Sequence, residues 1–304
     1  VSEESADMDE YSELLPLVDF VPVNDIQAMV EKVEHWVSSD VARKERNNEI
    51  RKGCADMPDI FSYYFLRLFL AHDLITYDDF YKAVGHVIQF DTDMICLGLP
   101  ETTARKVDFE KDNHYGIQYI PGLRHRLGWI GCGLSYKFLI NRAKDLNFPK
   151  ITICEDDVLL PDDFLSRLDN IKQYLSGKEN WDVFAGLIAD LHDDVKILNV
   201  EDVDNECYVH IDKMVSMVTN IYSNKFYDKL LAWDSCNHDS QSNTIDRFIE
   251  QHDDVHTIVT SRYLVGHKED LNSTLWGISN MTYKKLIQNS ENKLQDKIAA
   301  YKVN

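Results

Sequence analysis

The first third of the chain carries apolar residues at the spacing of α-helices. Ile26, Met29 and Val33 recur at intervals of three and four residues, after a suitable N-cap at Asn24. We expect helices after Asn24, over residues 40–52, after Pro58, and after the capping-box pair Thr76 and Asp79. The polar residues of this segment form no catalytic pattern, so we expect its many aromatic residues to serve packing.

Beyond residue 90, short apolar strands alternate with helical stretches. Strands are expected over residues 94–99, 116–120, 151–154, 182–186, 208–211, 214–219, 256–260 and 263–265. Helices are expected over residues 101–113, 133–146 and 161–175. This alternation predicts an α/β fold, in which a mostly parallel sheet carries helices on both faces and is preceded by an all-helical segment. We therefore divide the chain into a helical segment over 1–90 and an α/β domain over 91–304.

Composition and charge restrict the class of partner. Apolar residues make up 44% of the 304 residues, enough for a sizeable core. The chain has 32 Lys and Arg against 52 Asp and Glu, a net charge of −20. This balance argues against nucleic acid or an anionic lipid surface as the main partner, because both require a basic surface. No stretch approaches the length of a membrane span, so we expect at most peripheral membrane contact.

The cysteines indicate a reducing compartment. The chain has 6 of them, and none forms a C-x-x-C pair. Cys96 and Cys154 sit inside strand-like runs, as small buried apolar residues do. No signal-peptide pattern opens the chain, so we expect a cytoplasmic protein. Because the first residue is Val rather than Met, we also expect the chain to be part of a longer polypeptide.

The strongest chemical signal is a run of three acids directly after a buried strand. Glu155, Asp156 and Asp157 follow the strand 151–154, and an apolar run resumes at Val158. Adjacent carboxylates repel one another, and a hard divalent cation with oxygen ligands is the usual compensation. Ligands also bind at this edge of open α/β sheets. The alternative is a solvated acidic turn without function.

Two upstream stretches look suited to anions. Arg105 lies near the start of an expected helix, where the N-terminus favours negative groups and an arginine adds bidentate donors. Arg124 lies in a stretch in which five of the chain's 12 glycines fall between Gly116 and Gly133. We expect Ser135 in the first turn of the following helix. Glycines, arginines and a helix start together indicate a cradle for phosphate or sugar, although an ordinary loop and helix start explain each part alone.

Three downstream stretches place single polar residues next to expected elements. Asp190 and His192 follow a strand, Asp246 lies near a helix start, and His267 follows a strand and a glycine, where a metal ligand would fit. Each also has an ordinary explanation, because acids cap helices and a lone histidine is usually structural.

Taken in order, these residues resemble a glycosyltransferase of the GT-A fold, and in particular glycosyltransferase family 25, the lipopolysaccharide and lipooligosaccharide galactosyltransferases. Members have a strand similar to Ile95–Leu97, a helix with an arginine comparable with Arg105, a Gly-Cys-x-x-Ser-His motif and an apolar strand ending in Glu-Asp-Asp. Here the motif reads Gly131-Cys-Gly-Leu-Ser-Tyr136, so Tyr136 replaces the usual histidine. His267 also departs from the family, and resembles the C-terminal metal ligand of other GT-A enzymes. Residues 1–90 lie outside the resemblance and look like the closing helices of a GT-B glycosyltransferase.

The resemblance implies a metal-dependent transfer of a sugar, with galactose favoured, from a UDP-sugar to an oligosaccharide or glycolipid acceptor in bacterial surface polysaccharide synthesis. It implies Mn²⁺, or Mg²⁺ instead, held by Asp157, Glu155 and His267. The nucleotide-sugar-binding residues it implies are Leu97, Arg105, Arg124, Ser135, Glu155 and Asp156. For inversion, a general base must deprotonate the acceptor, and Asp246 is the first choice, with Asp190 second. Retention stays open. Trp129, Trp233 and Trp276 either stack on sugar rings or belong to the core.

Two functions from other classes also fit the sequence. One is a non-catalytic module that binds sugar or Ca²⁺ through the same acids. The other is a metal-dependent phosphohydrolase, which usually needs further ligands for a second metal ion.

Overall fold

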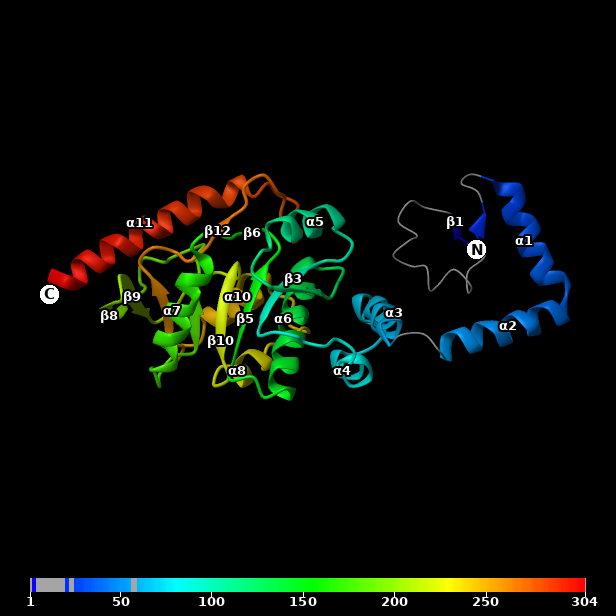
Figure 1. Ribbon diagram of the computed structural model, residues 1–304, viewed down its shortest axis with the longest axis horizontal. Coiled ribbons are helices and arrows are strands. Elements are labelled where there is room, and N and C mark those ends of the chain that lie inside the picture. The colour runs from blue at the N-terminus through cyan, green and yellow to red at the C-terminus, as the bar shows by residue number, and fades with distance from the viewer. Residues whose placement is uncertain (1, 4–19, 22–24, 56–58, 304) are drawn as a thin grey trace. The chain divides into compact units, whose positions relative to one another are not determined.

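The computed structural model describes residues 2–3, 20–21, 25–55 and 59–303 (Figure 1). Backbone contacts divide the chain into two compact units, Val1–Ser62 and Tyr63–Asn304. In the described part of the first unit, β1 (Ser2–Glu3) pairs in parallel with β2 (Phe20–Val21), and two helices follow, α1 (Ile26–Ser38) and α2 (Asp40–Ala55). Asp25 caps α1 by accepting a hydrogen bond from the backbone N–H of Ala28. The expected signals at Asn24 and Pro58 lie outside the described residues.

The second unit begins within α3 (Ile60–Ala71), which α4 (Tyr77–Val84) follows. The capping box before α4 is confirmed, because the Thr76 hydroxyl oxygen accepts from the Asp79 N–H. Tyr63 and Phe80 are fully buried and contact the ring of Phe138 in α6. The two helices therefore share a core with the α/β part of the chain. We retain residue 90 as a proposal for where the glycosyltransferase domain begins.

Within the described residues, the main sheet has eight strands in the order β4-β3-β5-β10-β7-β11-β9-β8. Their bounds are Met94–Gly98 (β3), Gln118–Pro121 (β4), Lys150–Glu155 (β5), Val183–Ala185 (β7), Ile197–Val203 (β8), Glu206–Ile211 (β9), Thr219–Ser223 (β10) and Thr257–Thr260 (β11). Only the pairs β3–β4, β3–β5 and β7–β11 are parallel, because β10 and β9 run against their neighbours. The α/β class is confirmed, but the sheet is mixed, and the prediction of a mostly parallel sheet was wrong.

Helices cover both faces of the sheet, as the sequence predicted. The alternation along β3 shows this, because Ile95 and Leu97 join one hydrophobic cluster and Cys96 joins the other. The helices on the first face, beside α3 and α4, are α6 (Gly128–Asp145), α8 (Tyr227–Leu231) and α10 (Ile245–Glu250), and those on the second face are α5 (Thr103–Asp112) and α7 (Phe164–Ser176). A short α9 (Ser240–Asn243) precedes α10.

Several expected boundaries were wrong, for reasons of tertiary packing. Helix α6 begins at Gly128 rather than Gly133, so Ser135 lies two turns inside it. Gly133 serves packing rather than ligand approach, because a Cβ there would lie 2.3 Å from the indole ring of Trp233. The apolar run 214–219 is mostly a buried connection, and the strand β10 starts only at Thr219.

Two elements at the C-terminal side of the sequence escaped prediction. The strand β8 is partly exposed along its length and pairs with β9 at the edge of the sheet. The helix α11 (Met281–Val303) lies beside these strands (Figure 1), and Lys302 pairs with Asp202 of β8. Helix α11 is polar along most of its length, and the apolar and polar residues of β8 do not alternate regularly, so neither element shows a clear periodicity. A second small pairing joins β6 (Val158–Leu159) to β12 (Gly266–His267). The strand expected over residues 263–265 was wrong, because these residues form a loop directly before β12.

Candidate functional site

The three acids lie where β5 ends and turns into β6. Glu155 is the last residue of β5 and pairs in register with Leu97 of the parallel neighbour β3. Asp156 and Asp157 follow in the turn, and both are about 95% buried. Burial of charged groups is costly unless they are paired, so this turn is no solvated acidic loop. The pairing of β6 with β12 then brings His267 opposite Val158, beside the acids.

Arg105 of α5 neutralises much of this charge. Its Nε lies 3.0 Å from Asp156 Oδ1, its Nη2 lies 3.0 Å from Asp157 Oδ2, and its Nη1 donates to the Asn272 carbonyl oxygen. An arginine therefore supplies a large part of the compensation that the sequence alone assigned to a metal ion. The side chain is nearly buried, and its planar fork suits this bridging position between two carboxylates.

Within the same turn, the pKa values of two carboxyl groups are shifted in opposite directions. Burial opposes ionisation of Asp157, but its hydrogen bond with His267 and the charge of Arg105 outweigh that effect and lower the pKa of Asp157 to about 2. Burial, reinforced by the charges of Asp157 and Asp156, raises the pKa of Glu155 to about 8. Such divergent environments within three residues are typical of functional sites.

The predicted metal ligands are brought together in part. Asp157 Oδ2 lies 3.4 Å from His267 Nε2, and Asn280 Nδ2 donates to the same Asp157 oxygen at 3.0 Å. Two further atoms, Asp157 Oδ1 and His267 Nδ1, are buried without a hydrogen-bond partner. Among the residues that the structure describes, no three His, Cys, Asp or Glu side chains gather closely enough to hold a metal ion by themselves.

A first cavity, of about 140 Å³, lies on the Arg105 side of the acidic turn, and we call it the arginine cavity. Its walls include every residue that the sequence assigned to nucleotide-sugar binding: Leu97, Arg105, Arg124, Ser135, Glu155 and Asp156. The Ser135 hydroxyl oxygen accepts from the Leu123 N–H at 2.8 Å, and the hydroxyl donates to the Gly131 carbonyl. Ser135 therefore holds the loop before α6 against that helix.

A second cavity, of about 320 Å³, lies on the other side of the turn, and we call it the carboxylate cavity. Asp190 and Asp246 line it together with Glu155, Asp157 and His267. Aromatic walls come from Trp129, Trp276 and Tyr283. Glu155 and Asp157 belong to both cavities, so the acidic turn forms their common wall. Trp233, in contrast, is fully buried in the core.

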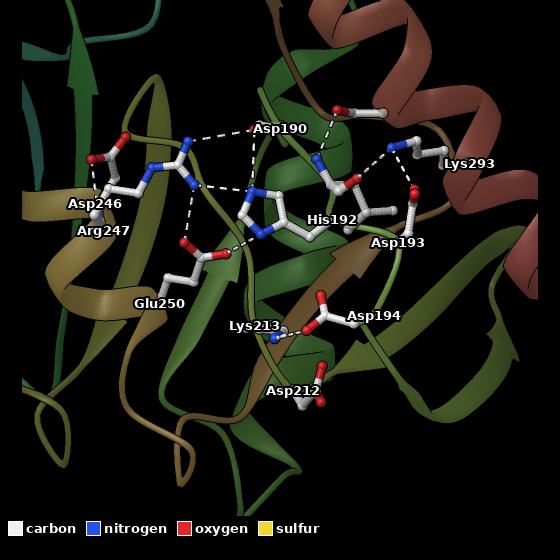
Figure 2. Close-up of polar contacts among 12 residues, drawn as sticks. Asp190, His192, Asp193, Asp194, Asp212, Lys213, Asp246, Arg247, Glu250 and Lys293 are labelled. Carbon is white, nitrogen blue, oxygen red and sulfur yellow. Dashed lines mark hydrogen bonds and ion pairs between the residues drawn. The ribbon is translucent and has the colours of Figure 1, made fainter. Parts of the chain in front are cut away.

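The two candidate bases have different surroundings. Asp246 lies in the first turn of α10 and accepts from the Arg247 N–H at 2.8 Å. Asp190 belongs to a charged network at the cavity edge (Figure 2), in which its Oδ2 lies 3.3 Å from His192 Nε2 and 3.5 Å from Arg247 Nη2. Glu250 completes the network by binding both His192 and Arg247. Asp190 is therefore in contact with two side chains, whereas Asp246 contacts a backbone amide.

Sequence reasoning missed several residues of the site. Asn280 is fully buried and donates to Asp157, and the turn 273–276 lines both cavities at once. The stretch Asn272-Ser-Thr-Leu-Trp276 follows His267 closely in sequence, which was the available signal. Asn280 carried none, because an isolated amide is common on any surface. Tyr136, which replaces the family's histidine, is fully buried and donates to the Met217 carbonyl oxygen at 2.9 Å.

Residues 110–231 match the sequence profile of Glycosyltransferase family 25 (LPS biosynthesis protein). This match spans α6, β5 and the acidic turn, and it confirms the family that the sequence resembles. Residues 110–231 are therefore similar to the glycosyltransferases of family 25. Arg105, Asp246 and His267 lie outside the matched residues, so their assignment to the site depends on the geometry described above.

No curated protein matches the chain. Among solved structures, the chain is similar to the crystal structure of A197 from STIV, with a TM-score of 0.35 and 11% identity over 57% of this chain and 81% of that one. None of the described helices combines the length and the apolar character that crossing a membrane requires.

Proposed function

We propose that the protein transfers a hexose, with galactose favoured, from a UDP-sugar to an oligosaccharide or glycolipid acceptor, on a GT-A-like domain over residues 91–304. Lipopolysaccharide synthesis in the bacterial cytoplasm is the setting that the family name suggests. The observation that carries this proposal is the pair of cavities that meet at Glu155 and Asp157. A transferase needs two substrates on either side of one reacting carbon, and two adjoining cavities provide that arrangement.

In this proposal the arginine cavity takes the nucleotide and its diphosphate. Arg105 and Arg124 supply cationic donors, and Leu97 and Ser135 form the wall beside them. Phosphate oxygens match the planar fork of a guanidinium, and the leaving diphosphate carries the negative charge that must be stabilised as the glycosidic bond breaks. Glu155 and Asp156 lie at the floor of this cavity, where one of them contacts the ribose.

The metal ion fits this wall as a cation held jointly by protein and substrate. Asp157 and His267 offer a carboxylate and an imidazole 3.4 Å apart, each with one buried atom free of hydrogen bonds. Magnesium-type sites often use one or two protein ligands and complete their shell with substrate phosphates and water. We assign Asp157 and His267 as ligands of Mn²⁺ or Mg²⁺, with Glu155 as a third candidate. The bound ion would stabilise the charge of the departing diphosphate.

Asp246 is our choice for the general base of an inverting transfer, and Asp190 is the alternative. Both line the carboxylate cavity, where the acceptor would lie against Trp276 and Tyr283. The Asp190 carboxylate already contacts His192 and Arg247, so these side chains compete with an acceptor for it. The carboxylate of Asp246 accepts a backbone N–H through one oxygen, so the second remains available to an acceptor hydroxyl.

A direct test is to incubate the purified protein with a panel of UDP- and GDP-sugars, in the presence of Mn²⁺ or of a chelator, and to measure nucleotide release with and without glycan acceptors. We expect release from a UDP-sugar that requires metal and increases with acceptor. Faster release of phosphate from simple phosphate esters would favour a phosphohydrolase. Tight binding of a sugar or of Ca²⁺ without turnover of any donor would favour a non-catalytic module.

A further inference from the structure

The loop that forms part of the wall of the arginine cavity is held in place by helix α3, which precedes the residues that match the family. This loop, residues 121–127, carries Arg124 and contributes Gly122, Leu123 and His125 to the cavity wall. Helix α3 contacts it twice: the Tyr63 hydroxyl donates to the Pro121 carbonyl oxygen at 2.7 Å, and Arg67 Nε donates to the Gly122 carbonyl oxygen at 2.6 Å.

The far end of the loop is tied to the turn after α3. Asp73 lies there, with a left-handed backbone φ of 57°. Its carboxylate oxygens lie 3.1 Å from His125 Nε2 and 3.3 Å from Arg126 Nη2. The His125 side chain is 98% buried, whereas the Asp73 side chain is 55% exposed, so the contact is enclosed on the side of His125 alone. Contacts at both ends therefore leave the loop little freedom relative to α3.

Arg67 makes the central contact and is itself 98% buried. Its guanidinium forms a two-pronged ion pair with Glu101, with Nη2 donating to Oε2 at 2.9 Å and Nη1 contacting Oε1. The outer side of Glu101 faces Arg124, whose Nη1 lies 3.9 Å from Glu101 Oε1. A buried cation with a bidentate partner is costly to displace, so Arg67 fixes the position of the Glu101 carboxylate. The more exposed Arg124 pairs with this fixed carboxylate.

We infer that Arg67 is a positioning residue for nucleotide binding: it holds the loop 121–127 in place and, through Glu101, keeps the guanidinium of Arg124 beside the arginine cavity. Neither Arg67 nor Glu101 lines a cavity or falls within the matched residues 110–231. The inference rests on the proposed function, because it takes the phosphates of a nucleotide as the ligand of Arg124. It also gives helix α3 a role in the site, although the sequence assigned that segment to packing alone.

The test compares two buried arginines that have the same kinds of partner. Arg67→Lys keeps the charge but loses the fork that binds Glu101 and Gly122 together. Arg167→Lys is the matched control, because Arg167 is about 95% buried, pairs with Glu206 in the same two-pronged way, and also donates to backbone carbonyls, yet lines neither cavity. Both variants should lower the melting temperature, so loss of stability alone cannot separate them.

Binding should separate them. We expect Arg67→Lys to weaken the binding of UDP, measured by calorimetry with Mn²⁺ present, by about tenfold, the loss typical of one displaced charged hydrogen bond. The KM for the donor should rise by a similar factor, while kcat and the KM for the acceptor change little. Arg167→Lys should leave all these values unchanged. Added to Arg124→Ala, the Arg67→Lys change should have a clearly smaller effect on UDP binding than in the wild type, since the part that acts through Arg124 is already lost.

Tyr63→Phe offers a milder variant should Arg67→Lys fail to fold, because it removes only the hydroxyl that binds Pro121. We expect it to weaken UDP binding by about threefold. The inference is overturned if the variants that fold bind UDP within about twofold of the wild type, or if the effects of Arg67→Lys and Arg124→Ala add. If the wild-type protein itself binds no nucleoside diphosphate, the proposed function fails and the inference with it.

Discussion

The arginine cavity and the carboxylate cavity share Glu155 and Asp157, yet their remaining walls carry opposite charge. Apart from the shared acids, Arg105 and Arg124 line the first against Asp156 alone. Asp190 and Asp246 line the second against Arg247. In an acidic protein of net charge −20, the cationic wall is the one that needs explanation. A diphosphate would be drawn to the first cavity and repelled from the second, so charge alone sorts donor from acceptor.

If the two cavities divide donor and acceptor in this way, the largest effect of a single substitution on activity is expected at Asp246. We expect Asp246→Asn to lower kcat by about 1,000-fold, because the amide cannot accept the proton of the acceptor hydroxyl. The binding of UDP should stay unchanged, since Asp246 lies in the carboxylate cavity. Transfer assays and calorimetry measure the two effects. Asp193→Asn, at a highly exposed acid paired with Lys293, is the control. A larger loss for Asp190→Asn than for Asp246→Asn would make Asp190 the base instead.

The shared wall predicts the next largest effect. Mn²⁺ should tighten UDP binding by about 100-fold over binding with a chelator, and Asp157→Asn should abolish that gain. Asp156→Asn is the matched control, because Asp156 is a buried neighbour that pairs with Arg105 but lies outside the proposed ligand pair. Titrating UDP by calorimetry with and without metal gives both values. A gain that survives in Asp157→Asn would contradict the assignment.

A smaller effect is expected at the aromatic wall of the carboxylate cavity. Trp276 is about half exposed and lines that cavity but not the arginine cavity. We expect Trp276→Ala to raise the KM for the acceptor by about three- to tenfold through the loss of stacking on a sugar ring, with UDP binding unchanged. Steady-state kinetics with each substrate varied in turn measures this. An equal change in donor KM would show that the two cavities do not divide the substrates.

The smallest effect lies outside both cavities and involves stability alone. His210 Nδ1 and His256 Nε2 are 2.8 Å apart, with Tyr174, Glu201, Lys178 and Asp182 around them. Burial lowers the pKa of both imidazoles, and for His210 the neighbouring His256 lowers it further.

Because the folded state binds these protons less readily than the unfolded chain, the free energy of unfolding should fall as the pH drops from about 7.5 to about 5.5. We expect His256→Gln to remove about 1 kcal/mol of that loss, measured by denaturant unfolding at each pH. Donor binding at neutral pH should not change. A pH dependence of stability identical to that of the wild type would contradict the role of this pair.

The elements predicted most accurately from sequence were those in which functional residues lie next to a clear secondary-structure signal. The strand before Glu155, the helix carrying Arg105 and the capping box at Thr76 were placed correctly because their signals are contiguous. The start of α6 and the strand at 214–219 were misplaced. Glycines that look like a loop serve close helix packing there, and a buried apolar run reads like a strand whether or not it pairs.

From its sequence alone, this protein could be placed in the α/β class, its resemblance to family 25 could be recognised, and its acidic turn could be identified as the centre of the site. Contiguous motifs determine these features, because they depend on residue types and spacing within a few turns of chain. Only the tertiary structure decided that Arg105 neutralises the acids, that Asp157 meets His267 and Asn280, and that helix α3 holds the loop of Arg124. Those contacts join residues from 51 to 123 positions apart, and the packing of the sheet and its helices alone brings them together.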